Sequence, residues 1–483
     1  MPRDDTAAGL RYVIVPHAAE YQKSPLGTPM KGIMTREELA ELISRGEIDT
    51  VLVVMTDMQG RLVGKRLTGH FFLESVEHGT HACDYLLGVD MEMEPVPGFR
   101  ATSWERGYGD FAIKPDLATL RRIPWLPATA LVLGDVVDHH GALVPHAPRS
   151  ILKRQIARLA ELGYVAKMAS ELEFYIFDDS YDAARQKVYR GIKPAGWYTE
   201  DYHIFQTTKE ETLARAIRNG MDGAGIPVES SKGEWSPGQA EINLVYAEAL
   251  AMADRHVIFK NGVKEIAFAQ GKSVTFMAKY AFDAAGSSCH IHGSLWEAAS
   301  DRPLFHDARE RHGMSLLFQR VLAGQLAAAR DISFFLAPTV NSYKRYQAAT
   351  FAPTKAVWSF DNRTAGFRVL GEGAAARVEC RIPGADVNPY LAYAALLAAG
   401  LHGVEQELKL PAPFSGNAYA DKESPEVAKT LRDAVAALDQ SALLRRAFGD
   451  DVIDHYVHAG RWEQAEYDRR ITDFELIRYF ERG

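Results

Sequence analysis

Residues 169–177 read ASELEFYIF, and this run of aromatic and aliphatic residues interrupted by two acids is typical of a β-strand. Successive side chains of a strand point to opposite faces, so Glu171 and Glu173 share one face with Tyr175, while the apolar residues between them fill the other. Alternation of this kind also marks a solvated strand edge. The aromatic content favours a buried strand whose acidic face lines a site.

Three later segments carry charged residues in the same pattern: EWSPGQAE at 234–241, HIH at 290–292 and RVECR at 377–381. Glu234 and Glu241 flank a Pro-Gly turn that lets both carboxylates point at one place, although acids in a surface turn give the same pattern. His290 and His292 place two imidazoles on one strand face, which suits a metal ion, although a single histidine is more often an ordinary hydrogen-bonding group. Cys289 points to the other face, and we interpret it as a packed thiol.

Acidic side chains dominate these segments. The four segments supply five glutamates, Glu379 among them, and we expect these carboxylates to converge with a histidine. Carboxylates gathered in one place repel one another at pH 7 unless cations lie between them. Oxygen ligands with an imidazole indicate hard divalent cations, Mg²⁺ or Mn²⁺, rather than zinc held by thiolates. The sequence therefore predicts a metal-centred active site.

The same part of the chain is rich in arginine: Arg345, Arg363, Arg368, Arg377 and Arg381. Guanidinium groups bind carboxylates and phosphates through two parallel hydrogen bonds. A basic surface is the plain alternative, but these arginines lie in short motifs between apolar strands, which favours a polyanion site. Divalent cations beside clustered arginines suit phosphoryl transfer. The chain has no GxxxxGK[ST] loop, so another device must hold a nucleotide.

The composition narrows the class of protein. The chain has 483 residues, 47% of them hydrophobic, and a net charge of −8. This length predicts a major domain with at least one smaller unit, and the negative charge argues against nucleic-acid binding. The three cysteines have no paired spacing, the first residues lack the apolar core of a signal peptide, and no run approaches the roughly 18 apolar residues of a membrane span. We therefore expect a cytoplasmic enzyme with no nucleic-acid or membrane partner.

Turn and cap signals divide the chain into three parts. Residues 1–34 are punctuated by Pro and Gly and predict a loosely held arm. Residues 35–128 predict a small mixed domain, and residues 129–483 predict a catalytic domain that alternates helices with strands. The predicted elements include a helix over 35–44, a hairpin over 51–67, a helix capped by Ser150 and a helix opened by Asn388-Pro389.

The charged segments resemble, in the same order, the signature blocks of the glutamine synthetase family. The matching blocks are 170–174, 233–241, 286–294, 337–345, 362–368 and 377–401, and the resemblance runs from about residue 35 to the C-terminus. It implies an α+β fold in which a β-grasp domain precedes a catalytic domain whose curved antiparallel strands, surrounded by helices, line a funnel. It also implies a homo-oligomer, commonly a dodecamer of two hexameric rings with active sites shared between neighbouring subunits.

The resemblance also implies a role for each matching position. One divalent cation would be held by Glu173, Glu234 and Glu241, the second of which also takes part in catalysis, and the other cation by Glu171, His290 and Glu379. The resemblance assigns binding of the glutamate substrate to Arg345, Arg381 and Gly286. It assigns binding of ATP to Glu229, His292, Ser294 and Arg368. Arg363 matches the residue that stabilises the transferring phosphoryl group, and Asp57 matches a carboxylate that deprotonates the amine in a neighbouring subunit. In the implied reaction ATP phosphorylates the γ-carboxylate of L-glutamate, and a nitrogen nucleophile then displaces phosphate.

Departures from the family pattern bear on the amine. Phe351 stands where glutamine synthetases carry a glutamate that helps to hold ammonium, and the loss of that charge-assisted contact removes about 1.5–3 kcal/mol of binding. Lys232 stands where ammonia-using bacterial enzymes tend to have histidine. Tyr202 is the nearest match to the tyrosine of the ammonium pocket, with Tyr198 second.

The positions that match the family's metal and phosphate ligands are retained, whereas the ammonium pocket is altered. This combination favours a γ-glutamyl-amide ligase acting on a primary amine. Phe351 and Trp235 can wall an apolar or aromatic amine or contact an alkylammonium through their ring faces. We predict a monoamine with an apolar or aromatic substituent, of the alkylamine, ethanolamine or aniline type. The alternatives are a glutamine synthetase that uses ammonium, a polyamine-specific ligase and an inactive structural homologue.

Overall fold

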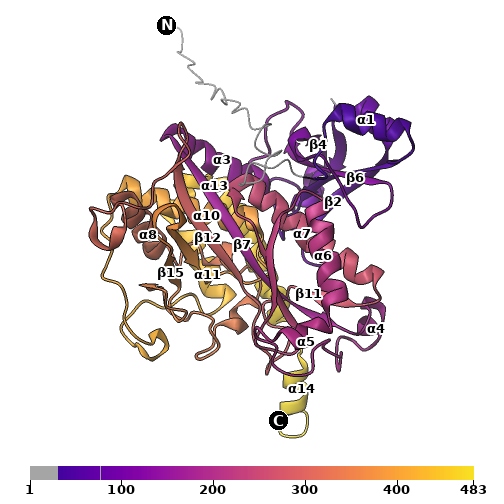
Figure 1. Cartoon of the computed structure of the whole chain (residues 1–483). Helices are drawn as coiled ribbons and strands as arrows, with labels where there is room; N and C mark the ends of the chain where they lie inside the picture. The colour runs from indigo at the N-terminus through magenta and orange to yellow at the C-terminus, as the bar shows by residue number, and fades with distance from the viewer. Residues whose placement is uncertain (1–30, 77) are drawn as a thin grey trace.

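The computed structural model describes residues 31–76 and 78–483. The predicted arm over residues 1–34 lies almost wholly outside the described residues. A smaller N-terminal unit packs beside a larger body in which long strands are flanked by helices (Figure 1).

The smaller unit is built around one mixed sheet. Its strands run in the order β2-β1-β6-β4-β3, with β5 paired to β6. Their bounds are β1 (Thr50–Thr56), β2 (Leu62–Thr68), β3 (Thr80–Cys83), β4 (Asp110–Pro115), β5 (Arg121–Arg122) and β6 (Thr129–Val137). The predicted hairpin is confirmed, since β1 and β2 pair antiparallel. Helices α1 (Arg36–Ser44) and α2 (Gly69–Ser75) share a hydrophobic core with β1.

Two sequence signals in this unit have different outcomes. The predicted first helix is confirmed, and Thr35 caps it in a capping box with Glu38. Strand β6 is hydrogen-bonded in parallel to β1, so the sheet continues past residue 128, where we expected the catalytic domain to begin. The sequence did not predict this pairing, because β6 reads as a buried strand and its periodicity does not say to which sheet it belongs.

The larger body is organised around a second sheet, whose strand order is β14-β15-β16-β12-β7-β9-β8. Its main strands are β7 (Tyr164–Phe177), β8 (Val228–Gly233), β9 (Gln239–Leu244), β12 (Cys289–Glu297), β14 (Trp358–Phe360), β15 (Phe367–Leu370) and β16 (Arg377–Cys380). Short strands β10 (Ala247–Glu248), β11 (Ser273–Thr275) and β13 (Arg302–Pro303) extend it. Every pairing along this order is antiparallel except β14 with β15. The strand predicted over 169–177 is confirmed as the C-terminal part of β7, at the centre of the sheet.

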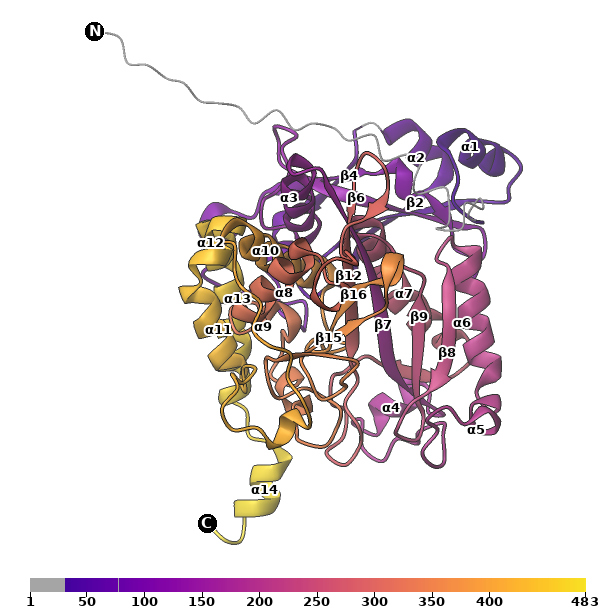
Figure 2. The same cartoon turned by 60° about the vertical axis from the view of Figure 1, so that its left-hand side comes forward.

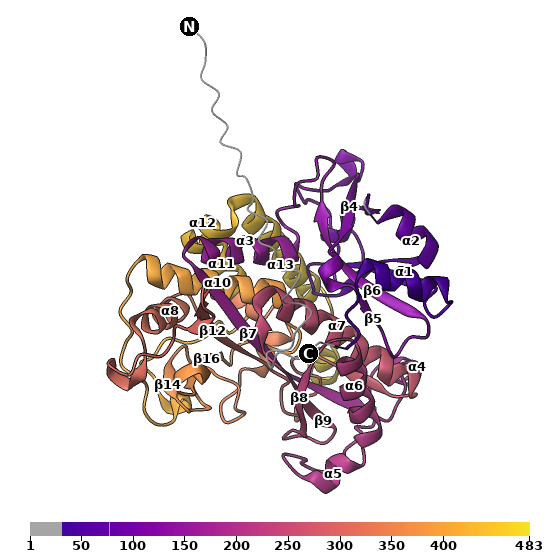
Figure 3. The same cartoon turned by 45° about the horizontal axis from the view of Figure 1, so that its top comes forward.

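Helices cover the sheet and its flanks. They are α3 (Pro148–Glu161), α4 (Tyr181–Gln186), α5 (Ile204–Thr208), α6 (Glu211–Gly223), α7 (Ala249–Ala269), α8 (Leu316–Ala327), α9 (Ser333–Leu336), α10 (Pro389–Glu405), α11 (Leu431–Gln440), α12 (Ala442–Phe448), α13 (Asp450–Asp468) and α14 (Asp473–Tyr479). Helices α3 and α7 pack on β7, and α10 packs on both of them. Figures 2 and 3 show α10, α12 and α13 grouped on one side of β7 and β12. No helix of the described chain is long and apolar enough to cross a membrane.

The two predicted helix starts differ in accuracy. Asn388 caps α10 with Pro389 in its first turn, as predicted. Ser150 is not a cap: α3 begins two residues earlier at Pro148, with Ala147 as the N-cap. Proline has a fixed φ and no N–H, so it opens this helix in place of the serine side chain.

A buried arginine joins the two units. The guanidinium of Arg149, on α3, donates to Asp116 (2.7 Å), to Asp135 on β6 (2.5 Å) and to Asp254 on α7 (3.0 Å). Burial alone would lower the pKa of Arg149, but the three carboxylates raise it well above its usual value. This network anchors the N-terminal sheet to the helices behind the catalytic sheet.

Candidate active site

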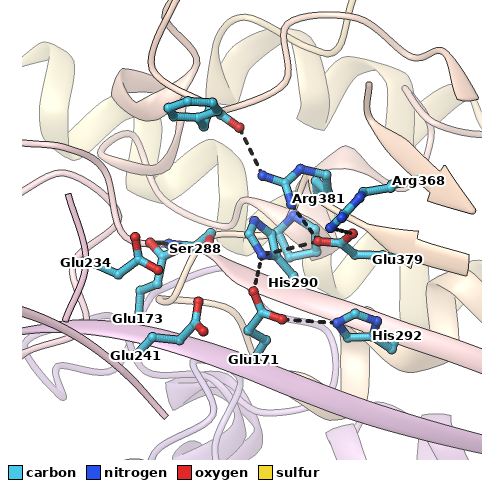
Figure 4. Close-up of polar contacts among 12 residues, drawn as sticks. Glu171, Glu173, Glu234, Glu241, Ser288, His290, His292, Arg368, Glu379 and Arg381 are labelled. Carbon is cyan, nitrogen blue, oxygen red and sulfur yellow. Dashed lines mark hydrogen bonds and ion pairs between the residues drawn. The ribbon is translucent and has the colours of Figure 1, made fainter. Parts of the chain in front are cut away.

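The register of the large sheet brings the predicted site residues together in rows across neighbouring strands. In one row Lys232 on β8 lies opposite Glu241 on β9, which lies opposite Glu173 on β7. Directly opposite side chains project from the same face of a sheet. The antiparallel pairing therefore converts distant positions in the chain into neighbours on one acidic face, part of which is drawn in Figure 4.

A second row lies beside the first. Glu171 on β7 is opposite His290 on β12. Two residues further along β12, His292 is opposite Glu379 on β16, and Glu379 is opposite Arg368 on β15. The alternation that predicted a charged strand face holds in all these strands.

Glu173, Glu234 and Glu241 form the first acidic cluster, with ligand oxygens that all lie within 4.8 Å of one another. Ser288 fixes the Glu173 carboxylate by donating from its backbone N–H (2.8 Å) and its hydroxyl (2.6 Å). Burial, together with the negative charge of Glu234, raises the pKa of Glu173. Burial and neighbouring carboxylates raise the pKa of Glu241 to about 11. Three acids held this closely resist ionisation together, so the cluster suits a cation.

Glu171, His292 and Glu379 form the second cluster, and their ligand atoms also lie within 4.8 Å of one another. The Nδ1 atom of His290 lies 2.8 Å from Glu171 and 3.5 Å from Glu379. Burial would raise the pKa of Glu171, but hydrogen bonds with His290 and His292 outweigh it and hold the pKa below its ordinary value. Both histidines therefore reach this cluster, whereas the sequence resemblance placed His292 with ATP alone.

The donor set of both clusters fits hard divalent cations. The six predicted ligand positions offer carboxylate oxygens and one imidazole, with a second imidazole from His292 within reach. Thiolates are excluded, because Cys289 and Cys380 are fully packed and burial raises the pKa of each to about 12. Mg²⁺ and Mn²⁺ prefer oxygen ligands of this kind.

Two arginines border the second cluster from the β15–β16 side (Figure 4). Arg381 donates to Glu379 (2.5 Å), and Arg368 donates to the other oxygen of the same carboxylate (3.0 Å). Burial would raise the pKa of Glu379, but His290 and Arg381 outweigh it and lower the pKa. Glu379 is thereby held as an anion between an imidazole and two guanidinium groups.

Arg345 is buried beneath this region. Its guanidinium donates to the backbone carbonyls of Ile382 and Pro383, the latter at 3.0 Å. A side chain at Gly286 would collide with Arg345, so the glycine is required for this close approach. The buried Nε atoms of Arg345 and Arg381 have no hydrogen-bond partner among the described residues. Unpartnered cationic donors beside the acidic clusters suit an anionic substrate group.

The other predicted positions lie around this centre or apart from it. Glu229 is exposed on β8, Ser294 lies on β12, where it accepts a hydrogen bond from Trp296 (2.9 Å), and the Arg363 side chain is exposed. Asp57 belongs to neither cluster: it is buried at the turn after β1, paired with Arg61 (2.6 Å). Burial raises the pKa of Asp57 against the lowering effect of Arg61.

Two aromatic side chains meet next to Glu234, which Trp235 follows in the chain. The rings of Trp235 and Phe351 meet edge to face with centroids 6.3 Å apart, although 116 positions separate them in sequence. Both are about half exposed, at 57% and 52%. Phe351 has a φ of +57°, which is costly for a bulky residue and so requires support from its surroundings. Tyr419 supplies such support by donating to the carbonyl of Ala352 (3.1 Å).

Comparison with known proteins identifies this arrangement. Residues 145–479 match the family model described as the glutamine synthetase catalytic domain. The chain belongs to the glutamine synthetase family. The predicted family and the predicted α+β fold are therefore confirmed, and the protein is an ATP-dependent ligase that forms C–N bonds.

Several members of the glutamine synthetase family resemble the chain over almost its whole length. It is 50% identical over 456 residues to the gamma-glutamylethanolamide synthetase GlnA4 of Streptomyces coelicolor, covering 94% of this chain and 97% of that protein. It is 37% identical to a glutamate–isopropylamine ligase from a Pseudomonas species, covering 92% of this chain and 97% of the relative. A solved structure of GmaS in complex with ADP matches with a TM-score of 0.81 and 29% identity, covering 93% of this chain and all of that chain.

Ser288 and Gln239 are supporting residues that the sequence analysis did not single out, and Lys232 was noted there only as a departure from the family pattern, without a contact to the acids. Ser288 and Gln239 both donate to Glu173, the latter at 3.2 Å. Lys232 contacts Glu234 and lies 3.8 Å from Glu241. A strand register would have been needed to find these contacts, and the glutamine synthetase blocks alone do not supply one.

Proposed function

We propose that the protein joins the γ-carboxylate of L-glutamate to a small primary monoamine at the expense of ATP. A γ-carboxylate oxygen attacks the terminal phosphorus of ATP, giving γ-glutamyl phosphate and ADP. The amine nitrogen then attacks the acyl carbon, the C–O bond breaks, and phosphate leaves with that oxygen. The amine loses one proton to a base. The product is a γ-glutamyl amide.

The observation that carries this proposal is the pair of acidic clusters with guanidinium groups beside them. We assign one divalent cation, Mg²⁺ or Mn²⁺, to Glu173, Glu234 and Glu241, and another to Glu171, His290 and Glu379, with His292 close enough to join the second. When bound, such cations neutralise the charge of the transferring phosphoryl group. Arg368 and the exposed Arg363 would contact phosphates, and Glu229 and Ser294 the rest of ATP.

Glutamate would be held by the buried arginines. The guanidinium groups of Arg345 and Arg381 are of the kind that bind a carboxylate through charge-assisted hydrogen bonds, and their buried Nε atoms have no partner among the described residues. Gly286 matters indirectly, because it leaves the space that the Arg345 side chain occupies. Activation by ATP is chemically required, since a carboxylate does not react with an amine until it gains a good leaving group.

The aromatic pair of Trp235 and Phe351 indicates which amine the protein would accept. Two relatives are named for ethanolamine and isopropylamine, both small monoamines. The edge-to-face pair of Trp235 and Phe351 would give the carbon substituent of such an amine an apolar surface. Tyr202, which is 64% exposed, would complete the pocket.

The remaining assignments concern assembly. We propose that Asp57 serves as the base in a neighbouring subunit, because it is buried in the N-terminal unit and belongs to neither cluster of its own chain. This requires a ring of subunits, which we propose to be a dodecamer. We place the enzyme in the cytoplasm, where its three free cysteines, Cys83, Cys289 and Cys380, would stay reduced.

An amine panel tests the proposal. ADP release would be measured with ATP, glutamate and each of ethanolamine, isopropylamine, methylamine, aniline, putrescine and ammonium, and the product would be identified by mass spectrometry. We expect γ-glutamyl amides of the small monoamines at the highest kcat/KM. Preference for ammonium would identify a glutamine synthetase, preference for putrescine a polyamine ligase, and no turnover with any amine an inactive homologue.

A further inference from the structure

Lys232 places a fixed positive charge inside the first acidic cluster. Its ammonium group forms a close ion pair with Glu234 and lies 3.8 Å from Glu241. The strand register builds this in, because Lys232 and Glu241 are directly opposite on β8 and β9. The lysine is therefore in the same cross-strand row as two of the three acids, Glu241 and Glu173.

Lys232 and a divalent cation would compete for the same carboxylate oxygens. Glu234 and Glu241 are two of the three side chains whose ligand atoms converge within 4.8 Å. An ammonium group bonded to Glu234 occupies a lone pair that a divalent cation would need. It also reduces the formal charge of the cluster, since one positive charge lies among three carboxylates.

In the same position Lys232 also contacts an aromatic ring. Its Nζ atom lies 4.6 Å from the centroid of the Tyr202 ring, within the range of a cation–π contact. Backbone hydrogen bonds fix the Tyr202 segment to the end of β8, since the N–H of Asp201 donates to the backbone carbonyl of Glu234 (2.9 Å). If a cation displaced the ammonium group from Glu234, the Tyr202 ring would still offer it a partner within the site.

We infer that Lys232 is a resident counter-ion of the first cluster that weakens divalent-cation binding there and moves toward Tyr202 when the cation enters. It acts as a positioning residue, because it touches the ligands rather than the reacting atoms. The inference rests on the proposed function only in taking this cluster as a cation site. Weak binding would let the cation exchange during turnover while the acids remain neutralised in its absence.

Direct binding of Mn²⁺ to the enzyme without nucleotide or glutamate tests this, by electron paramagnetic resonance of free Mn²⁺. The measurement is made in a Glu379→Gln background, so that the second cluster is weakened and the first is observed. We expect Lys232→Met to tighten Mn²⁺ binding on the order of tenfold, because a positive charge within about 4–6 Å disfavours a second cation by that amount or more. Lys232→Arg should keep the weaker binding.

Lys209→Met is the matched control. Lys209 lies 3.9 Å from the Trp197 ring centroid and donates to Gln206, so its removal deletes a nearby cation over aromatic rings without touching either cluster. It should leave Mn²⁺ affinity unchanged. Equal or weaker binding by Lys232→Met would overturn the inference while leaving the proposed function intact. Absence of Mn²⁺ binding at this cluster in every variant, Lys232→Met included, would overturn both.

Discussion

Replacing Phe351 with glutamate changes the proposed amine pocket at the position where the family resemblance implies a glutamate in ammonium-using enzymes. A glutamate there offers an incoming ammonium ion a charge-assisted contact, which is worth about 1.5–3 kcal/mol when well formed. The Phe351 side chain is 52% exposed, so solvent screening favours the lower end of that range. The same change removes the edge-to-face contact with Trp235, worth about 0.5–1.5 kcal/mol to a pocket built on it.

The new carboxylate favours ammonium, and the loss of the ring contact disfavours the larger amine, so both effects change the substrate ratio in the same sense. Their sum is about 2–3 kcal/mol, which corresponds to a change of about 30-fold to 150-fold in the ratio of kcat/KM for ammonium to that for ethanolamine or isopropylamine. Steady-state ADP release with each amine measures that ratio. Fold stability should change little, because the side chain is half exposed and both residues pay the same backbone strain at a φ of +57°.

Trp235→Ala separates the two contributions. It removes the aromatic contact but adds no acid, so kcat/KM for the larger amine should fall by about threefold to tenfold without any rise for ammonium. An unchanged substrate ratio in Phe351→Glu, or an equal rise for ammonium in Trp235→Ala, would refute the assignment of this ring pair to the amine.

Three further perturbations follow from the contacts described above. Glu379→Gln should lower kcat by at least about a thousandfold, the scale of loss expected when a main electrostatic contribution to the transition state is removed. Circular dichroism would check that the variant is folded, and a folded variant that keeps its activity would exclude Glu379 as a ligand. Arg149→Met should cost about 3–5 kcal/mol in the free energy of unfolding, since it removes the buried guanidinium that Asp116, Asp135 and Asp254 share. Chemical denaturation measures this, and a loss under 1 kcal/mol, which is on the order of an exposed ion pair, would contradict the buried network. Burial lowers the pKa of His146 from 6.5 to about 4. Its contribution to the free energy of unfolding is therefore fully present above pH 6.5 and falls by about 3 kcal/mol as the pH drops toward 4, because the unfolded chain binds the proton first. His146→Gln should reduce the pH dependence of unfolding between these values, and an unchanged slope would contradict the burial of His146.

Much of the site could be predicted because strand alternation is local. The two acids in ASELEFYIF and the histidines in HIH fix which face each side chain takes, and the structure places them as the alternation requires. Their convergence could not be read from periodicity, because it depends on which strands pair and in what register. The resemblance to glutamine synthetases supplied that information for the acids, but not for Lys232 or Ser288.

The predictions that the structure corrects, and the contacts that were not predicted, also depend on neighbours that a local pattern does not specify. Ser150 carries the right side chain for a cap, yet Pro148 opens the helix first. Strand β6 reads as a buried strand in either unit, and only its parallel pairing with β1 assigns it to the N-terminal sheet. The contact between Trp235 and Phe351 joins a turn after β8 to a distant loop, and no local signal in either segment predicts it.

The path of one oxygen atom tests the central claim most directly. Glutamate labelled with oxygen-18 in its γ-carboxylate would be incubated with ATP and ethanolamine, and the inorganic phosphate released would be analysed by mass spectrometry. If the reaction passes through γ-glutamyl phosphate, each phosphate carries one labelled oxygen taken from the carboxylate. Unlabelled phosphate alongside γ-glutamyl amide would contradict the acyl-phosphate route.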